Sequence, residues 1–418
     1  MDGYLEPGQR LCVALSGGLD SVVLLHAALS VAQDVKAREC FAAHVNHGIS
    51  LNSDRWESFC EFLTEALGVK LHSYRVSVLS QGEGLEASAR QARYNTLQQS
   101  DCDWILLGHH RNDQAETLLL NILRGSGVHG ASAMRERNGK LLRPLLGFSR
   151  DEIALYAKDN GLSWVEDESN LDKHFRRNFL RHDVVPLLET KFPQTVSSLV
   201  RAASLFADSA GLLDEMAKDD LGLQRLLLVK QLQDKTLARA ANLLAYYLRK
   251  HKLQIPSSAT LNEMLRQLLE AGCDSEICFK IGDHEVRRFQ GRIYVERAPR
   301  PVSPCAWSLE PVVAWGSDSI RCLPARGNGV SMAELTKHPL KFSYRQGGET
   351  LQLRVDGPQR QLKDLMREAV IPPWRRKSLP ILFAGNDVVW VEGLGIAAKY
   401  QCKPDEEGIL IEFDRLTW

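Results

Sequence analysis

Short apolar runs alternate with longer amphipathic segments over residues 1–190. Four of the runs predict buried strands: Leu11–Leu15, Cys40–Asn46, Lys70–Val76 and Trp104–Leu107. Three intervening segments have apolar residues at helical spacing: Ser21–Gln33, Asp54–Leu67 and Leu85–Gln99. This order implies right-handed crossovers and a parallel sheet with helices on both faces. We therefore expect a doubly wound α/β domain whose ligands bind at the carboxyl ends of the strands.

The pattern changes beyond this first domain. Residues 191–300 predict a mainly helical domain, although short β-like runs such as Ile293–Glu296 occur near its end. Three closely spaced prolines follow, so we interpret residues 301–340 as a linker. Residues 341–418 contain alternating apolar runs and glycine-containing turns, which predict a small mixed α/β domain.

Composition narrows the class of protein. A chain of 418 residues is too long for one ordinary core, and its net charge of zero argues against indiscriminate nucleic-acid binding. Its nine cysteines never form CxxC, which favours reduced thiols and disfavours a zinc site. The first residues lack the pattern of an export signal, and no stretch approaches the ~20 apolar residues that span a bilayer. We expect a cytoplasmic protein without a membrane partner.

A glycine-rich loop follows the first predicted strand. It contains Ser16, Gly17, Gly18, Leu19, Asp20 and Ser21 and leads into a helix. Adjacent glycines let backbone N–H groups approach phosphate oxygens, and the helix N-terminus adds its positive dipole end. A carboxylate here would repel phosphate unless a cation such as Mg²⁺ lay between them. The alternative is a plain turn with a helix cap, but the complete string after a strand favours a nucleotide site.

Two further candidate groups follow later elements. His44 and Asn46 end the second predicted strand, where polar side chains suit adenosine contact or substrate orientation; a capped turn is the alternative. In the helix 85–99, Arg93 is a candidate for holding a phosphate or the RNA backbone. Glu86 and Arg90 on the same helix could form only a surface ion pair.

Two acids follow the fourth predicted strand. Asp113 and Glu116 are three residues apart near the start of a predicted helix, so they share one face. They could complete Mg²⁺ coordination or hold the ammonium of an amine substrate, and an acidic first turn that complements the helix dipole is the alternative. His109 precedes Asp113 by four residues, so either side chain could orient the other.

Basic clusters supply candidate RNA contacts. Arg177 and Arg181 fall on one helical face. The C-terminal candidates combine positive charge with an aromatic ring and could grip RNA by phosphate contact and stacking: Arg345, Lys363, Arg367, Trp374, Arg375 and Arg376. A solvated basic surface is the alternative for both clusters.

The glycine loop resembles that of the PP-loop family of ATP pyrophosphatases, which implies a Rossmann-like nucleotide domain and chemistry at the α-phosphorus. The strings HVNHG, ExxARxxRY, HHRNDQAET, LRGSG, RPLL, DESN and RRNFLR also appear. In this order they resemble the tRNA(Ile)-lysidine synthetase family over most of the chain. Ser50 stands where that family often has arginine, so a role for that position is in doubt.

The resemblance implies a specific reaction. ATP adenylates the carbon-2 oxygen of the wobble cytidine in a CAU-anticodon tRNA(Ile), and the ε-amine of free L-lysine then displaces AMP to form lysidine. Because they share a placement at strand ends, we expect catalytic roles for Asp20, Arg93, Asp113 and Glu116, with Mg²⁺ on Asp20 and on Asp113 or Glu116, lysine on Glu116 or Asp113, and Arg93 on the phosphates or the activated base. Which acid meets which ligand stays open. No obligate protein partner is evident, and a homodimer is possible on sequence grounds.

Two rival classes are consistent with parts of the pattern. A sulfur-transfer enzyme of the PP-loop family would adenylate the same base, but its chemistry would need paired cysteines or an iron–sulfur cluster. A non-catalytic tRNA-binding protein could retain a decayed nucleotide fold. The intact loop from Ser16 to Ser21 and the two later acids favour an active ligase.

Overall fold

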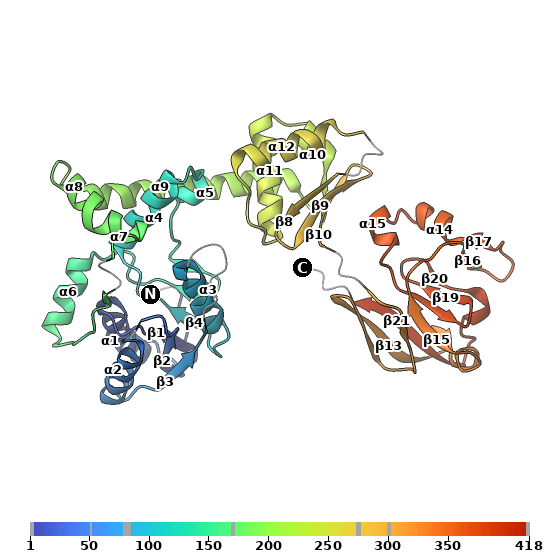
Figure 1. The fold of residues 1–418 in the computed structure, drawn as a ribbon, viewed down its shortest axis with the longest axis horizontal. Helices are drawn as coiled ribbons and strands as arrows, with labels where there is room; N and C mark the ends of the chain where they lie inside the picture. Colours follow the sequence, from blue (N-terminus) through green and yellow to red (C-terminus); the bar gives the residue numbers. More distant parts are fainter. Residues whose placement is uncertain are drawn as a thin grey trace. The chain divides into compact units, whose positions relative to one another are not determined.

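The computed structural model describes residues 4–50, 52–77, 85–168, 172–272, 277–298 and 302–414, without the side chains of residues 85–87. Ser169, Asn170 and the Glu86 side chain therefore lie outside the described part of the chain. The chain divides into two compact units, Met1–Glu215 and Met216–Trp418. Figure 1 shows their elements.

The first unit is built on a six-stranded sheet in the order β3-β2-β1-β4-β6-β5. Its strands are β1 (Arg10–Ala14), β2 (Glu39–Asn46), β3 (Leu71–Arg75), β4 (Trp104–Leu106), β5 (Arg137–Asn138) and β6 (Leu141–Leu142). All neighbours run parallel except β5 and β6, which are antiparallel. The predicted doubly wound α/β fold is confirmed; only the two-residue strands were not foreseen.

Both faces of this sheet are covered. The helices are α1 (Leu19–Asp34), α2 (Ser53–Ala66), α3 (Leu85–Gln98), α4 (Arg111–Leu123), α5 (Val128–Ala131) and α6 (Arg150–Asp159). Because strand side chains alternate, Leu11 and Val13 of β1 join a core with α1 and α6. Cys12 between them joins the opposite core with Leu97 of α3. The alternation that predicts a strand thus also sorts its residues between two cores.

The strand order creates the site. From β1 the chain proceeds outward through β2 and β3 and then returns to β4 on the other side of β1. Connections after β1 and β4 therefore diverge at their carboxyl ends, and such a switch point is where open α/β sheets bind ligands. The residues after these strands are the glycine loop and the string that begins at Gly108.

Four helical segments complete the first unit and lead into the second: α7 (Arg176–Phe179), the π-helix η2 (Leu180–Val184), α8 (Val185–Glu189) and α9 (Thr195–Leu221). Among described residues, α9 is the helix long and apolar enough to cross a membrane by length and composition, with mean hydropathy 1.2. This corrects the expectation that no segment approaches that composition. Val196 and Ala203 of α9 pack against Ala115 and Leu118 of α4, which accounts for part of its apolar character.

The second unit begins with helices packed on a four-stranded sheet, as the mainly helical prediction anticipated in part. The helices are α10 (Val229–Gln233), α11 (Leu237–Lys250) and α12 (Ser258–Glu270). The strands lie in the order β7 (Leu227–Leu228), β10 (Arg292–Arg297), β9 (His284–Phe289) and β8 (Cys278–Ile281). Fully buried Tyr247 of α11 donates a hydrogen bond to the Ile293 carbonyl of β10 at 3.0 Å, which ties helix to sheet.

The rest of the second unit contains two further antiparallel sheets, of five and four strands, together with smaller elements. One sheet has the order β11 (Cys305–Ala306), β15 (Leu340–Ser343), β18 (Ile381–Ala384), β19 (Asp387–Val391) and β20 (Gly395–Ile396). The other has the order β12 (Val312–Trp315), β13 (Asp318–Arg326), β21 (Glu407–Asp414) and β14 (Val330–Ser331). The smaller elements are α13 (Met332–Leu335), β16 (Thr350–Leu351), β17 (Arg360–Gln361), α14 (Leu362–Glu368), α15 (Pro373–Arg376) and η3 (Ala398–Tyr400).

The prediction that residues 301–340 form a linker is wrong. β13 from this segment pairs with β21 along its whole length, from Ser319 opposite Asp414 to Arg326 opposite Glu407. Trp315 and Ile320 are buried in the same core as β18 and β19. The segment therefore belongs to the C-terminal domain, because its strands β12, β13 and β14 form one sheet with β21.

Candidate active site

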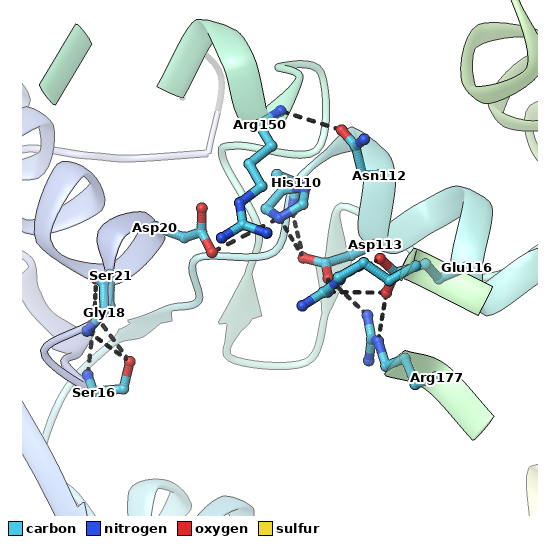
Figure 2. Close-up of polar contacts among 11 residues, drawn as sticks. Ser16, Gly18, Asp20, Ser21, His110, Asn112, Asp113, Glu116, Arg150 and Arg177 are labelled. Carbon is cyan, nitrogen blue, oxygen red and sulfur yellow. Dashed lines mark hydrogen bonds and ion pairs between the residues drawn. The ribbon is translucent and has the colours of Figure 1, made fainter. Parts of the chain in front are cut away.

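The glycine loop connects β1 to the N-terminus of α1. Gly17 has φ of +85°, a conformation that only glycine adopts readily, and a Cβ there would also lie 3.0 Å from Val165. The Ser21 hydroxyl donates to the Gly18 carbonyl at 2.9 Å and accepts from the Ser16 N–H at 3.2 Å. These bonds close the turn at the start of α1 (Figure 2). Such a turn, opening a helix N-terminus, is suited to phosphate oxygens.

Two candidates for ATP contact, His44 and Asn46, form hydrogen bonds within the protein in this structure. His44 is buried, and its Nδ1 lies 2.9 Å from the carbonyl oxygen of Leu15, which immediately precedes the loop. The Asn46 amide donates to Asp54 at 3.1 Å and to Glu57 at 2.8 Å, while its oxygen accepts from the Gly48 N–H at 2.9 Å. Direct contact of either side chain with ATP stays a prediction.

Asp20 is an acid with too few partners. Its Oδ1 is buried and has no hydrogen-bond partner among the described residues. Its Oδ2 lies 3.7 Å from Nε2 of His110, and Figure 2 shows Asp20 facing His110 and Arg150. Burial raises the pKa of Asp20, and the positive field of His110 opposes that shift only in part. An under-compensated carboxylate beside a phosphate loop fits a divalent cation, whose ligands are oxygens.

Asp113 and Glu116 belong to what we call the acid–arginine cluster, defined as Asp113, Glu116, Arg177 and Arg181. Arg177 donates to Glu116 at 2.7 Å and to Asp113 at 2.8 Å. Arg181 donates to the same two acids at 2.7 and 3.1 Å. The guanidiniums reach the acids from α7 and η2, more than sixty residues further along the chain.

This cluster changes the interpretation of its four members. Arg177 and Arg181, predicted to contact RNA, here bind the two acids, and sequence reasoning did not find that pairing. Burial alone would raise the pKa of Asp113, but Arg177 and the two neighbouring histidines outweigh it and lower the pKa to about 2. Asp113 is therefore ionised at neutral pH and already surrounded by positive charge.

His110 joins the two acidic regions, and sequence reasoning assigned it no role. It is buried, and its ring Nε2 lies 3.5 Å from Asp113 and 3.7 Å from Asp20. Its backbone N–H donates to Asp113 at 3.0 Å. The described residues contain no cluster of three or more His, Cys, Asp or Glu side chains arranged around a metal position. Asp20 thus fits a cation better than Asp113 does, since Asp113 already has arginine and histidine partners.

Close packing fixes where Asp20 lies. A Cβ added to Gly108, directly after β4, would lie 3.1 Å from both the carbonyl carbon and the oxygen of Asp20. Contacts this short are tighter than side chains normally make, so glycine lets the end of β4 approach the start of α1. The glycine between a buried strand and a pair of histidines was the available sequence signal for this contact.

Arg93 of α3 lies beside a histidine of the HVNHG string. Its Nη2 is 3.1 Å from Nε2 of His47. The Arg93 side chain is accessible to solvent, but its guanidinium is crowded by protein, and this desolvation lowers its pKa. Among the described residues, no carboxylate lies within ion-pair distance of it. An accessible cation with no acidic partner is suited to bind an anion.

The C-terminal candidates divide into two groups. The Trp374 indole donates to Glu296 at 2.9 Å, and Arg375 forms an ion pair with the same carboxylate, so both side chains contact β10. Arg376 donates to the Ile371 carbonyl at 2.7 Å; desolvation and then the charges of Arg367 and Arg345 lower its pKa. Arg367 and Arg345 therefore each lie close enough to Arg376 to repel it. Lys363 is exposed on α14.

The parallel sheet, the phosphate loop at its switch point and the buried acids define a nucleotide-binding ligase of the PP-loop class. The sequence agrees: residues 4–188 match the PP-loop domain family, residues 227–294 the TilS substrate binding domain and residues 340–418 the TilS substrate C-terminal domain.

Relatives along the whole chain extend this assignment. The chain is 38% identical to a tRNA(Ile)-lysidine synthase of Nitrosomonas europaea, over 97% of this chain and 92% of the relative. It is 39% identical to one of Azoarcus sp. over 97% and 92%, and 38% identical to one of Aromatoleum aromaticum over 98% and 99%. The chain belongs to the tRNA(Ile)-lysidine synthase family, and it is an ATP-dependent ligase that modifies tRNA.

Proposed function

We propose that the enzyme adenylates the carbon-2 oxygen of the wobble cytidine in tRNA(Ile) with a CAU anticodon, and that the ε-amine of lysine then displaces AMP to give lysidine. The observation that carries this proposal is the under-compensated Asp20 beside the phosphate loop. A loop that holds the outer phosphates leaves the α-phosphorus for attack, and AMP and pyrophosphate are the expected products.

Two chemical steps are needed because the cytosine carbonyl is a poor electrophile. Its oxygen is a very poor leaving group, whereas AMP is a good one. In the first step the carbonyl oxygen bonds to the α-phosphorus and pyrophosphate leaves. In the second the amine bonds to carbon 2, the carbon–oxygen bond to AMP breaks and the amine loses its protons. Positioning and charge stabilisation are the main contributions a protein can make to such transfers.

We assign the loop and its surroundings to the first step. The N–H groups at the start of α1 bind outer phosphate oxygens. Mg²⁺, held by Asp20, would neutralise charge on ATP when bound. Arg93 holds a phosphate group of ATP or of the RNA near the carboxyl end of β2. Each role uses a group that lacks a full set of partners in the described structure.

We assign the acid–arginine cluster to lysine. Asp113 and Glu116 attract the positive groups of the amino acid, and Arg177 or Arg181 can meet its carboxylate. Free lysine has a side-chain pKa near 10.4, so only about 0.1% is uncharged at neutral pH. Asp113, with its pKa near 2, is a weak proton acceptor. We therefore propose that the two guanidiniums offset the preference of the two carboxylates for the protonated amine, since like charge disfavours that form.

We assign tRNA contact to the second unit. Arg345 and Arg367 lie close enough to Arg376 to lower its pKa, and although Arg345 lies 3.9 Å from Glu349, the three positive charges can meet RNA phosphates, with Lys363 extending the surface. Replacing the three arginines with alanine should flatten the log–log dependence of tRNA affinity on salt by about two to three units. Arg375→Gln removes one positive charge that is already paired with Glu296, so it should flatten the slope least; an unchanged slope in the triple variant would reject the assignment.

One incubation tests the proposed reaction. The purified protein is mixed with ATP, Mg²⁺, radiolabelled lysine and bulk tRNA, and both the nucleotide products and the labelled RNA are identified. We expect AMP and pyrophosphate, formed only when tRNA is present, and label on a CAU-anticodon tRNA. Release of ADP and orthophosphate would contradict the proposal. ATP, free lysine and tRNA meet in the cytoplasm, where we propose that the enzyme acts.

A further inference from the structure

The HVNHG string contains three polar side chains with different surroundings. His44 contacts the backbone before the phosphate loop, and Asn46 ties its turn to α2. His47 instead reaches across to α3, where its Nε2 lies 3.1 Å from Nη2 of Arg93. A guanidinium can only donate, so His47 must accept with Nε2 and carry its proton on Nδ1.

The surroundings of His47 keep it neutral. Desolvation, followed by the charges of Arg93 and His44, lowers its pKa to about 4, while Asp167 acts in the opposite direction. A neutral imidazole can hold a guanidinium in place by a hydrogen bond without cancelling its positive charge. A carboxylate at this position would hold it equally well but would neutralise it.

The other arginine of α3, Arg90, has no histidine acceptor to itself, unlike Arg93 with His47. Arg90 lies 3.4 Å from Nε2 of His109, but Arg143 already donates to Nδ1 of that ring at 3.2 Å. A neutral ring has one acceptor nitrogen, so it cannot accept from both guanidiniums. His47 has one guanidinium contact in the described structure, and Arg93 is its donor.

We propose that His47 is a positioning residue for the adenylation step, a neutral acceptor that orients Arg93 toward a phosphate group of the bound substrates. The inference rests on the role of Arg93 proposed above and adds the residue that fixes its geometry. The phosphate could belong to ATP or to the RNA backbone. No other described side chain is hydrogen-bonded to the Arg93 guanidinium, so its orientation depends on this one contact.

The test measures pyrophosphate release in a single turnover for His47→Ala, His47→Gln and His47→Glu, together with KM for ATP and for tRNA. His47→Ala should slow release by about 10- to 100-fold, the usual cost of a misplaced group. His47→Gln supplies a neutral oxygen acceptor and should recover part of the rate. His47→Glu should be slower than His47→Gln, because its carboxylate would neutralise Arg93. His26→Gln, at a histidine of α1 that contacts Tyr156, is the matched control and should leave the rate unchanged.

A double-mutant cycle separates positioning from a structural role. In an Arg93→Ala background, His47→Ala should cause no further loss. A full additional loss, or a His47→Glu variant as fast as His47→Gln, would overturn the proposal. Alongside the slower release, a raised KM for tRNA would place the phosphate in RNA, and a raised KM for ATP would place it in ATP. Melting temperatures close to that of the parent protein verify folding.

The same cycle distinguishes this inference from the proposed function. If Arg93→Ala keeps the parent rate, the assigned role of Arg93 fails and the role of His47 fails with it. If Arg93→Ala is slow but His47→Ala is as fast as the parent protein, only the role of His47 is wrong.

Discussion

The phosphate-loop region and the acid–arginine cluster lie at the same edge of one sheet, yet they differ in how far the negative charge of their carboxylates is compensated by positive groups. Asp20 has a buried oxygen without a partner among the described residues, and burial raises its pKa. Asp113 has two guanidinium partners; burial would raise its pKa, but Arg177 and the two neighbouring histidines lower it to about 2. Asp20 can therefore accept a positive partner from a bound ligand, whereas Asp113 already has positive partners in the folded chain.

The two acids also have opposite links to stability. The folded pKa of Asp113 is below its unfolded value, so its contribution is present above the unfolded pKa near 4 and is lost as pH falls toward 2. The folded pKa of Asp20 is raised, so its contribution is present below the unfolded value and is lost as pH rises through the folded one. At neutral pH the Asp20 charge therefore opposes folding while the Asp113 charge favours it.

Removing the charge of Asp20 should have the largest effect. Asp20→Asn should reduce AMP formation by about 10²-fold or more, the scale on which preorganised electrostatic groups act. It should also raise the melting temperature at pH 7, and this gain should shrink as pH falls toward 4. Enzyme assays and melting curves across pH provide the test. tRNA binding serves as the control and should be retained, because Asp20 is assigned no RNA contact; an Asp20→Asn variant that forms AMP at the parent rate would contradict the assignment.

Breaking the cluster should have the opposite effect on stability. Glu116→Gln leaves Arg177 and Arg181 without one of their carboxylates, and losing one member of a buried pair costs about 3 to 5 kcal/mol. Denaturant unfolding of the first unit measures the loss. Glu152→Gln, which removes a more exposed carboxylate 3.5 Å from Arg111, is the matched control and should cost about 1 kcal/mol or less. Equal losses in the two variants would refute the claim that the cluster stabilises the fold.

A smaller effect should follow from moving Asp20 without removing it. Gly108→Ala places a methyl group 3.1 Å from the Asp20 backbone, which should cost about 1 to 3 kcal/mol and slow AMP formation by about 10-fold. Gly147→Ala, where nothing lies within 4 Å of the added carbon, is the control. If both variants matched the parent protein in rate and stability, the close approach of β4 to α1 would have no functional role.

The extent of the sequence prediction differs between these two regions for a physical reason. Apolar alternation, Gly17 and the following helix are local signals, and they were sufficient for the sheet and the phosphate loop. The cluster depends on Arg177 and Arg181 reaching acids more than sixty residues earlier in the chain, and no local pattern specifies that distance.

The same limit explains the wrong linker. Strand β14 has two residues, too few for a periodic signal, and β13 pairs with β21 about ninety residues later. The closely spaced prolines before β11 were a local signal, and they suggested separation where non-local pairing joins the segment to the C-terminal domain. The hydrogen bonds of Asn46 to Asp54 and Glu57 likewise depend on the packing of α2 beside β2, so no local signal predicted them, and contact of Asn46 with ATP stays a prediction.

The most direct test is the Mg²⁺-dependent part of the thermal stabilisation by ATP, measured without tRNA in the parent protein, Asp20→Asn and Asp113→Asn. Each protein is compared with its own ligand-free form, so changes in intrinsic stability cancel. We expect Mg²⁺ to add to the ATP-induced rise in melting temperature for the parent and for Asp113→Asn, and to add nothing for Asp20→Asn. If Mg²⁺ added as much to the melting temperature of Asp20→Asn as to that of the parent protein, the claim that Asp20 binds the cation would be contradicted.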